Sequence, residues 1–342
     1  MVFLNHGSFG ACPRPVLEEY QRWQRELERQ PVEFLGRRWD ELLGEARAAL
    51  ARYVGARPDD LVFVPNATTA MNTVARSLRL GPDDEVLTSE HEYGAIDYVW
   101  EATGASVVRR PLESLWDGVS ERTRVLSIQP RRVADRGRRR RRRRPLPAGA
   151  GRRDPLGRGR RARAGPGARR PRLARRRRLR GQLPQVAVRA EGRAGFLWVR
   201  EELQQRIDPL VVSWGWPKEQ FGERHGWQGT RDPAAWLAVP AAIEFQREWG
   251  WDEVRERCHA LAERFLESSG LSPAGRPFAQ MVSVELPPCN PEEVQRRLRE
   301  EHSIEVPCFE RNGRALLRLS VQGYNGEEDV DRLSSALQAL LS

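Results

Sequence analysis

The four residues Asn66-Ala67-Thr68-Thr69 have the types and spacing of an anion-binding turn. The preceding run, Leu61–Val64, is short and apolar, which is typical of a buried strand. Apolar residues then recur at helical spacing from Ala70 onward. Because Asn and Thr are common N-cap residues, the pattern predicts a strand, a tight turn and a helix N-terminus. Unpaired backbone N–H groups at such a terminus could hold a phosphate, and an ordinary capped helix is the alternative interpretation.

The elements around this turn alternate between strands and helices. Further strands are expected at Glu85–Thr88, Ala105–Val108 and Arg124–Ile128, and amphipathic helices at about 15–30 and 39–54. This alternation predicts βαβ units in a mainly parallel sheet. Ligands of such sheets bind at the carboxyl ends of the strands, where Asn66–Thr69 and His91–Tyr93 should lie.

The same pattern returns after residue 193. Strands are expected at Gly195–Val199, Met281–Leu286 and Ala315–Ser320, and helices at about 233–249, 251–268, 291–301 and 326–341. The predicted fold class is therefore α/β, with a large domain formed by 1–128 and 194–235. A smaller C-terminal α/β domain is expected over 236–342, and residues 129–193 interrupt the large domain.

The charge of the chain is concentrated in that interruption. The net charge is +11, yet residues 131–193 alone hold 26 arginines, no lysine and 3 acidic residues. The rest of the chain has 32 basic and 44 acidic residues, so an acidic protein contains one strongly basic block. The block uses nine residue types and has no aromatic residue, so it cannot bury enough apolar surface to offset its ordering entropy. We expect residues 131–193 to be disordered or misformed.

Several classes of protein are disfavoured by composition. The cysteines Cys12, Cys258, Cys289 and Cys308 are scattered and no histidine groups with them, so no metal site is expected. No N-terminal segment has the layout of a signal peptide and no apolar run approaches the length of a membrane span. We expect a reduced, cytoplasmic protein that does not bind membranes.

Five stretches taken in order resemble the class V aminotransferase family, pyridoxal-phosphate enzymes of fold type I. The stretches are Leu4–Ala11, Asn66–Asn72, Glu90–Ala95, Gly229–Pro233, and Leu317–Ser320 with Gly323–Asn325. They cover about 1–128 and 194–342 and look most like the isopenicillin-N-epimerase and cysteine-desulfhydrase-like group. The resemblance implies a fold-type-I transferase fold, a homodimer, an amino acid substrate and the cofactor pyridoxal 5′-phosphate.

The resemblance also implies roles for individual residues. Ala67, Thr68 and Thr69 would form the phosphate cup, and Thr230 would reach a phosphate, in such dimers often that of the partner subunit. Tyr93, or alternatively His91, would cover the cofactor ring. Arg318 would bind the substrate α-carboxylate bidentately, and Asn5 and His6 would line the substrate entrance. The structural alternatives are a core aromatic for Tyr93, an ion pair for Arg318 and a helix cap for Thr230.

Two parts that the family requires are missing. The family places an aspartate against the pyridine nitrogen and, further on, a Schiff-base lysine shortly before a Gly-Phe-Leu strand. Both belong inside the basic block, but the chain has a single lysine, Lys218, which follows Gly195-Phe196-Leu197. No catalytic lysine is therefore assigned. We also expect the sheet to lack two central strands, beside Val125–Ile128 and Phe196–Val199.

A change of reading frame would explain the missing parts. All nine residue types of the block have GC-rich codons, and a permitted codon choice for Gln182–Val188, shifted by one base, reads Asn-Cys-His-Lys-Trp-Leu. In the same frame Leu156–Ala168 can read Ser-Val-Val-Asp-Gly-Ala-His, which is a strand ending in aspartate. Gln129–Asp135 can likewise encode Ser-His-Val-Ala-Ser-Pro. The hypothesis is a pair of compensating frame changes, near Gln129 and near Arg193.

Two other interpretations remain open. Arg138–Arg144 is a run of seven arginines that would attract nucleic-acid phosphates. The block has no aromatic residues for base stacking and its flanks are acidic, which disfavours nucleic-acid binding. The other alternative is a natural pseudoenzyme that works without pyridoxal phosphate.

The family resemblance implies an enzyme acting on an amino acid by desulfhydration, epimerisation or transamination, and the chain is expected to be inactive as written.

Overall fold

The computed structural model describes residues 1–90, 92–128, 194–275, 277 and 279–341. All of these residues fall in one compact unit, which comprises Met1–Arg131 and Leu179–Ser342. The expectations for residues 129–193, including the missing strands and the disorder, lie outside the described residues. No described helix is long and apolar enough to span a membrane.

Helices make up most of the described chain. Its α-helices are α1 (His6–Phe9), α2 (Arg14–Arg29), α3 (Trp39–Val54), α4 (Ala67–Leu78), α5 (Gly94–Glu101), α6 (Glu201–Gln204), α7 (Phe221–Gly226), α8 (Ala234–Leu237), α9 (Val239–Glu248), α10 (Trp251–Ser269), α11 (Pro291–His302) and α12 (Glu327–Leu341). A π-helix at Val32–Arg37 and 3₁₀ turns at Pro58–Asp60 and Leu112–Gly118 complete the set.

The strands are short. They are β1 (Val2–Phe3), β2 (Leu61–Val64), β3 (Glu85–Ser89), β4 (Ser106–Arg110), β5 (Thr123–Ser127), β6 (Gly195–Trp198), β7 (Met281–Glu285), β8 (Ile304–Glu305), β9 (Cys308–Arg311) and β10 (Arg314–Ser320). Every sequence-predicted strand is present, because each apolar run is bounded by turn-forming residues. The two-residue strands β1 and β8 and the strand β9 carry too few apolar residues to be predicted from the sequence.

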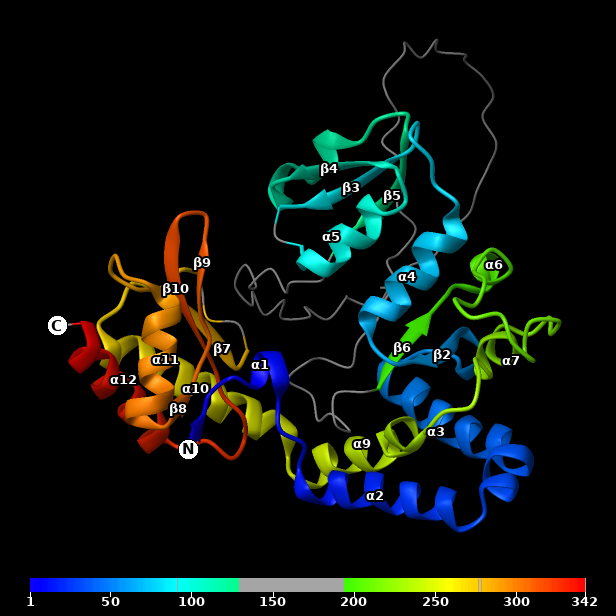
Figure 1. Cartoon of the computed structure of the whole chain (residues 1–342), viewed down its shortest axis with the longest axis horizontal. Helices are drawn as coiled ribbons and strands as arrows, with labels where there is room; N and C mark the ends of the chain where they lie inside the picture. Colours follow the sequence, from blue (N-terminus) through cyan, green and yellow to red (C-terminus); the bar gives the residue numbers. More distant parts are fainter. Residues whose placement is uncertain (91, 129–193, 276, 278, 342) are drawn as a thin grey trace, which may run out of the picture. The chain divides into compact units, whose positions relative to one another are not determined.

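Two sheets are built from β2 to β6 (Figure 1). The strands β4, β3 and β5 form a parallel sheet, and β2 pairs antiparallel with β6 in a second sheet. Among the described strands, β5 pairs only with β3 and β6 pairs only with β2. Both edge strands of each sheet therefore have no further neighbour among the described strands, and the predicted gap beside Val125–Ile128 and Phe196–Val199 stays a prediction.

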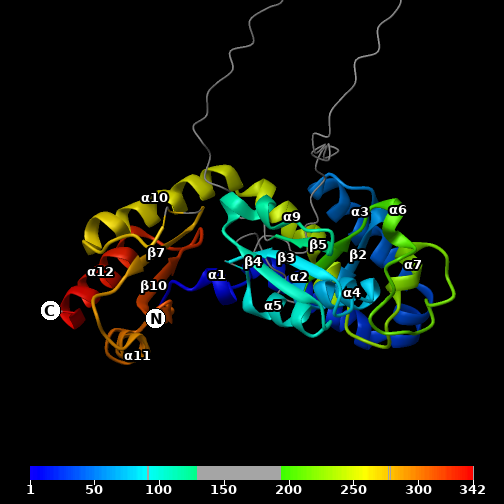
Figure 2. The same ribbon diagram turned by 90° about the horizontal axis from the view of Figure 1, so that it is seen from above.

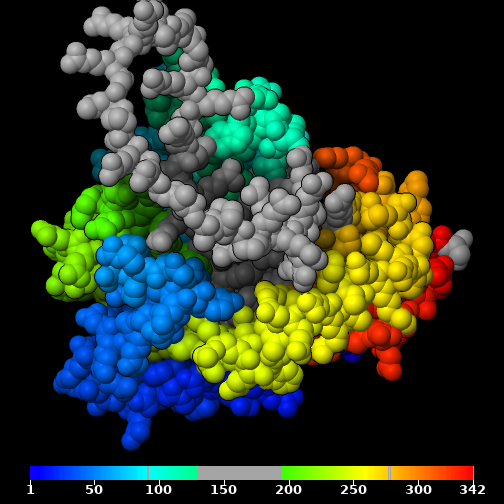
Figure 3. Space-filling view, turned by 180° about the vertical axis from the view of Figure 1, so that it is seen from behind, coloured from blue at the N-terminus to red at the C-terminus, as the bar shows by residue number. Residues whose placement is uncertain are grey.

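Helix α4 packs against both of these sheets. Its residue Ala70 belongs to the core around β2 and β6, whereas Ala75 belongs to the core around β3. Helices α2, α3 and α9 form a third layer, in which α9 contacts both of the others. Figure 3 shows the blue residues of the α3 region beside the yellow-green residues of the α9 region. The first turn of α4 is thus held by packing on more than one side.

The C-terminal residues build a separate hydrophobic core. The antiparallel sheet β7-β10-β9 packs with α10, α11 and α12 (Figure 2), and buries side chains such as Phe265, Leu298 and Leu317. The N-terminal residues Val2 and Leu4 also pack in this core, because β1 pairs in parallel with β8. The first residues of the chain are therefore fixed beside β10.

Candidate functional site

The predicted phosphate cup is the first turn of α4, directly after β2. The side chain of Asn66 caps the helix: its Oδ1 accepts hydrogen bonds from the backbone N–H of Thr69 at 2.8 Å and from the Thr69 hydroxyl at 3.0 Å. The backbone N–H groups of Ala67 and Thr68 have no acceptor among the described residues. The helix is capped, as the alternative interpretation holds, and still presents two unpaired donors at its positive end.

Gly195 and Trp236 contact the end of β2 and the start of this turn. Gly195 pairs with Val64 at the end of β2, and a Cβ at position 195 would lie 2.9 Å from Cα of Asn66. The indole N–H of Trp236 donates to the carbonyl of Val64 at 3.3 Å, and its ring stacks on Phe63. The turn therefore rests on a close backbone contact on one side and on a buried tryptophan on the other.

Arg318 lies on β10 and has the surroundings of a carboxylate-binding residue. No carboxylate of the described residues forms an ion pair with it, and its Nη2 donates to the hydroxyl of Ser8. Its Nε is buried and has no hydrogen-bond partner among the residues that the structure describes. Burial lowers the pKa of the Arg318 guanidinium from its ordinary value. A buried donor without a partner costs free energy, so this guanidinium is suited to an anion supplied from outside.

Asn5 and His6 are the N-cap and the first residue of α1. Asn5 bridges to Ser320 on β10, and its Oδ1 is buried without a hydrogen-bond partner among the described residues. His6 is only 1 % exposed: Nε2 contacts the carbonyl of Phe3 at 3.0 Å, and Nδ1 contacts the hydroxyl of Tyr324 at 3.2 Å. Burial lowers the pKa of His6 to about 4. The neutral imidazole thus joins the N-terminal segment to the loop after β10, and its role in lining the substrate entrance stays a prediction.

Tyr93 and Thr230 lie at the surface. Tyr93 follows β3 as the N-cap residue of α5 and is 59 % exposed, so it is not a core aromatic. The exposed Thr230 follows Gly229, whose φ of +102° favours glycine. No hydrogen bond of the described residues joins either side chain to Ala67–Thr69. His91 lies outside the described residues.

Lys218 is in a turn between α6 and α7. Its backbone N–H donates to the carbonyl of Gly215 at 3.0 Å, and its side chain is exposed. No ion pair or hydrogen bond of its amino group occurs within the described part of the chain. An exposed ammonium in a turn lacks the enclosed apolar site in which a reactive lysine works.

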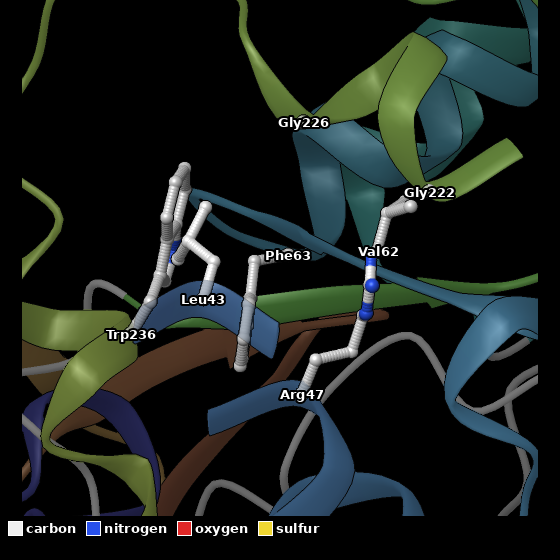
Figure 4. A pocket seen from close by; sticks show the side chains of 7 residues that line it. All are labelled: Leu43, Arg47, Val62, Phe63, Gly222, Gly226 and Trp236. Atoms are coloured by element: carbon white, nitrogen blue, oxygen red, sulfur yellow. The ribbon is translucent and has the colours of Figure 1, made fainter. Parts of the chain in front are cut away.

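A small cavity lies under β2 (Figure 4), away from these residues. It has a volume of about 20 Å³, and its lining residues are Leu43, Arg47, Val62, Phe63, Gly222, Gly226 and Trp236. Arg47 points toward Gly222, where a Cβ would meet Nη1, and its Nε has no hydrogen-bond partner. This volume holds about one water molecule, far less than a cofactor needs. No group of His, Cys, Asp and Glu side chains suited to a metal occurs among the described residues.

The structure therefore brings together two sets of predicted residues. Asn5 bridges to Ser320 on the strand that carries Arg318, His6 contacts Tyr324 in the loop after that strand, and Ala67, Thr68 and Thr69 form one helical turn. The sequence reasoning assigned no role to Ser8, Gly195 or Trp236. Gly195, which precedes the apolar residues of β6, could have indicated a close approach of two backbone segments. Nothing in the sequence indicates the contact of Ser8 with Arg318.

Comparisons with known proteins show the family to which the chain is related. The model of the family described as aminotransferase class-V matches residues 10–129. The chain is 32 % identical to an isopenicillin N epimerase of Amycolatopsis lactamdurans, over 98 % of this chain and 94 % of that protein. It is 28 % identical to a putative L-cysteine desulfhydrase of Oryza sativa subsp. japonica, over 99 % of this chain and 83 % of that protein.

The fold also matches that of a solved structure. A mutant of C-DES with glycine covalently linked to its pyridoxal phosphate cofactor superposes with a TM-score of 0.68 at 16 % identity, over 98 % of this chain and 96 % of that one. This likeness confirms the expected α/β fold.

Proposed function

Because the chain belongs to the class V aminotransferase family, whose members are pyridoxal-phosphate-dependent enzymes, we propose that its site is built for that cofactor and an amino acid. The reaction type would be desulfhydration, epimerisation or transamination, and the chain as written would be inactive. The observation that carries the proposal is that the described residues include two potential anion sites: a helical turn at the start of α4 with N–H groups that have no described acceptor, and an arginine with no described carboxylate partner. A cofactor phosphate and an amino acid carboxylate are the two anions that such an enzyme must hold.

The phosphate end of pyridoxal 5′-phosphate fits this chain. We propose that the N–H groups of Ala67 and Thr68 donate to the phosphate, while the side chain of Thr69 keeps Asn66 in place as the cap. Tyr93 would cover the ring, and Thr230 would serve the phosphate of a partner subunit in a homodimer. The large domain of 1–128 and 194–235 and the small domain of 236–342 remain part of this proposal.

The carboxylate end of an amino acid fits as well. We propose that Arg318 binds the α-carboxylate, since its guanidinium is half-buried and its Nε lacks a partner. Asn5 would contact the substrate near this position. His6, being buried and bonded on both ring nitrogens, would hold Tyr324 and the N-terminal segment in place.

The aldehyde end of the cofactor does not fit. The chain has one lysine, Lys218, and its amino group is exposed in a turn that follows β6. The only acidic residues of 129–193 are Asp135, Asp154 and Glu191, which lie outside the described residues. No reaction step through the cofactor is therefore derived for the chain as written. The proposed origin of the disagreement is the pair of frame changes near Gln129 and Arg193.

Reduction with borohydride tests the proposal on the chain as written. We expect no stoichiometric phosphopyridoxyl adduct after addition of pyridoxal 5′-phosphate, because no lysine occupies the required position. Peptide mass spectrometry would locate any adduct, and Lys218→Arg is the matched control for slow surface reaction. A stoichiometric adduct on Lys218 in the wild-type chain would overturn the claim of inactivity.

The alternative, a nucleic-acid-binding protein, rests on the run Arg138–Arg144. Such binding would weaken steeply as salt increases, because it would release counterions from the phosphate backbone. Salt-sensitive binding of RNA or DNA that persists in a chain lacking 1–128 would favour this alternative over the enzyme. A chain whose printed frame is confirmed in the gene and in expressed protein would favour the pseudoenzyme.

A further inference from the structure

One edge of the Arg318 guanidinium, formed by Nε and Nη2, has a described partner at Nη2 only. Other described arginines show how this edge binds a carboxylate with both nitrogens. Four of them bind a carboxylate with both Nε and Nη2, at distances between 2.6 and 3.0 Å: Arg22 with Glu19, Arg264 with Asp331, Arg296 with Glu293 and Arg297 with Glu301. In each pair, one carboxylate oxygen faces each nitrogen of the same edge of the guanidinium.

Within the part of the chain that the structure describes, the same edge of Arg318 has no carboxylate partner. Its Nη2 donates to the hydroxyl oxygen of Ser8, and its buried Nε has no hydrogen-bond partner there. The Ser8 oxygen accordingly lies where one carboxylate oxygen lies in the four pairs, and no described side chain supplies the second. A carboxylate that binds this edge with both oxygens must displace the Ser8 hydroxyl from Nη2.

The backbone beside Ser8 is held firmly. The N–H of Gly7 donates to the hydroxyl of Ser320 at 2.8 Å, and a Cβ at position 7 would lie 2.6 Å from the sulfur of Met281. The segment of α1 that carries Ser8 is thus anchored to β10 and β7. Rotation about the Cα–Cβ bond of Ser8 is enough to release Nη2 without any movement of the helix, and such rotations are fast.

We propose that Ser8 sets the affinity of the Arg318 site for amino acid carboxylates by competing for Nη2. The inference rests on the proposed function, in which Arg318 binds the substrate α-carboxylate. In the free protein the serine satisfies one buried donor of the guanidinium. When a carboxylate binds, that hydrogen bond is exchanged for a stronger charge-assisted one, so part of the binding free energy is spent on displacing the serine.

The test compares ligands that differ only in the carboxylate. Binding of L-alanine and of L-alaninamide to the full chain is measured by ligand-observed NMR, because this readout needs no cofactor and no turnover. We expect Ser8→Ala to bind L-alanine about tenfold more tightly than wild type, since a hydrogen bond to a charged group no longer competes. Binding of L-alaninamide should not change.

Three variants serve as controls. Ser8→Thr keeps the hydroxyl and should retain the wild-type affinity, and Ser114→Ala changes a distant serine and should do the same. Arg318→Ala should remove the preference for L-alanine over L-alaninamide. Circular dichroism and thermal unfolding establish that each variant is folded.

The outcomes separate the inference from the function on which it rests. Wild-type or weaker affinity of folded Ser8→Ala for L-alanine, with the preference lost in Arg318→Ala, would overturn the role of Ser8 and leave the role of Arg318 intact. If neither wild type nor Ser8→Ala prefers L-alanine to L-alaninamide, both the carboxylate site and the inference are wrong. The third outcome would support both the carboxylate site and the role of Ser8. In it, Ser8→Ala prefers L-alanine to L-alaninamide more strongly than wild type does, and the double variant Ser8→Ala, Arg318→Ala has no such preference.

Discussion

Gly195 lies against the backbone of Asn66, so that a Cβ at position 195 would be 2.9 Å from Cα of Asn66 and 3.0 Å from its carbonyl carbon. Real side chains do not tolerate such distances to backbone atoms, and the turn would have to shift. The start of β6 thus sets the position of the turn that opens α4. A contact between residues far apart in the sequence defines the proposed phosphate cup.

The variant Gly195→Ala should disturb this cup. We expect a loss of unfolding free energy of about 1–3 kcal/mol, which is typical of overpacking, and weaker binding of pyridoxamine 5′-phosphate. Urea unfolding and equilibrium dialysis measure the two effects. Gly44→Ala is the matched control, because a Cβ at this helical position meets no atom within 4 Å. Wild-type stability and binding in Gly195→Ala would show that the contact does not constrain the turn.

Arg318→Ala should separate substrate binding from cofactor binding. In a protein that carries the shifted frame between Gln129 and Arg193, we expect amino acid affinity to fall about thirtyfold, because a bidentate charged contact is lost. Retention of pyridoxal phosphate should not change, because the cup is a separate element. Absorbance titrations with an amino acid report both quantities.

The control for that variant lies on the same strand. Arg314→Ala removes an exposed arginine that is paired with Glu285, and should leave amino acid affinity unchanged. Equal losses in the two variants would mean that the strand is perturbed and that Arg318 has no particular role.

Acid should destabilise the fold through two buried histidines. Burial lowers the pKa of both His6 and His225 to about 4, from an ordinary value of 6.5. Between pH 6.5 and pH 4 the unfolded chain binds protons that the folded chain does not, so stability is complete above pH 6.5 and falls as the pH decreases. For each histidine, the free energy of unfolding should be about 2 kcal/mol lower at pH 5 than at pH 7.5.

Urea unfolding at pH 7.5 and pH 5 measures this effect. His6→Gln and His225→Gln should each reduce the difference between the two pH values by about half, and the double variant should remove most of it. Carboxylates with a lowered pKa, such as Asp331, make the stability depend on pH mainly below pH 4.5. They therefore change the stability little between pH 7.5 and pH 5. A difference that the double variant retains in full would contradict the assignment to these histidines.

Most of the fold could be predicted from the sequence, because local patterns are strong in this chain. The apolar run Leu61–Val64 and the predicted strand Glu85–Thr88, with Val86 and Leu87 at its centre, are both strands in the structure. The segment 233–249 was predicted as one helix and is two, α8 and α9, which meet at Ala238. Pro240 opens α9 at a position that tolerates proline. The π-helix after α2 depends on packing around Phe34 and has no local signature.

The site was less predictable than the fold. Asn66 and the residues after it could be recognised because capping is a local property of the sequence. The contacts of Arg318 with Ser8 and of Gly195 with Asn66 join residues distant in the sequence, and only the fold brings them together. The burial of His6 could not be read from its polar, glycine-rich surroundings, because it follows from the pairing of β1 with β8.

The central claim is that the chain has both anion sites of its family but not the lysine. The direct measurement compares two proteins, the chain as written and the chain with the shifted frame between Gln129 and Arg193. Each is loaded with pyridoxal 5′-phosphate, reduced with borohydride and mapped by mass spectrometry. We predict a stoichiometric adduct in the shifted-frame protein, on the lysine whose codon spans those of Gln185 and Val186, and none in the chain as written. A folded shifted-frame protein that takes up no cofactor, or an equal adduct on Lys218 in both proteins, would contradict the account.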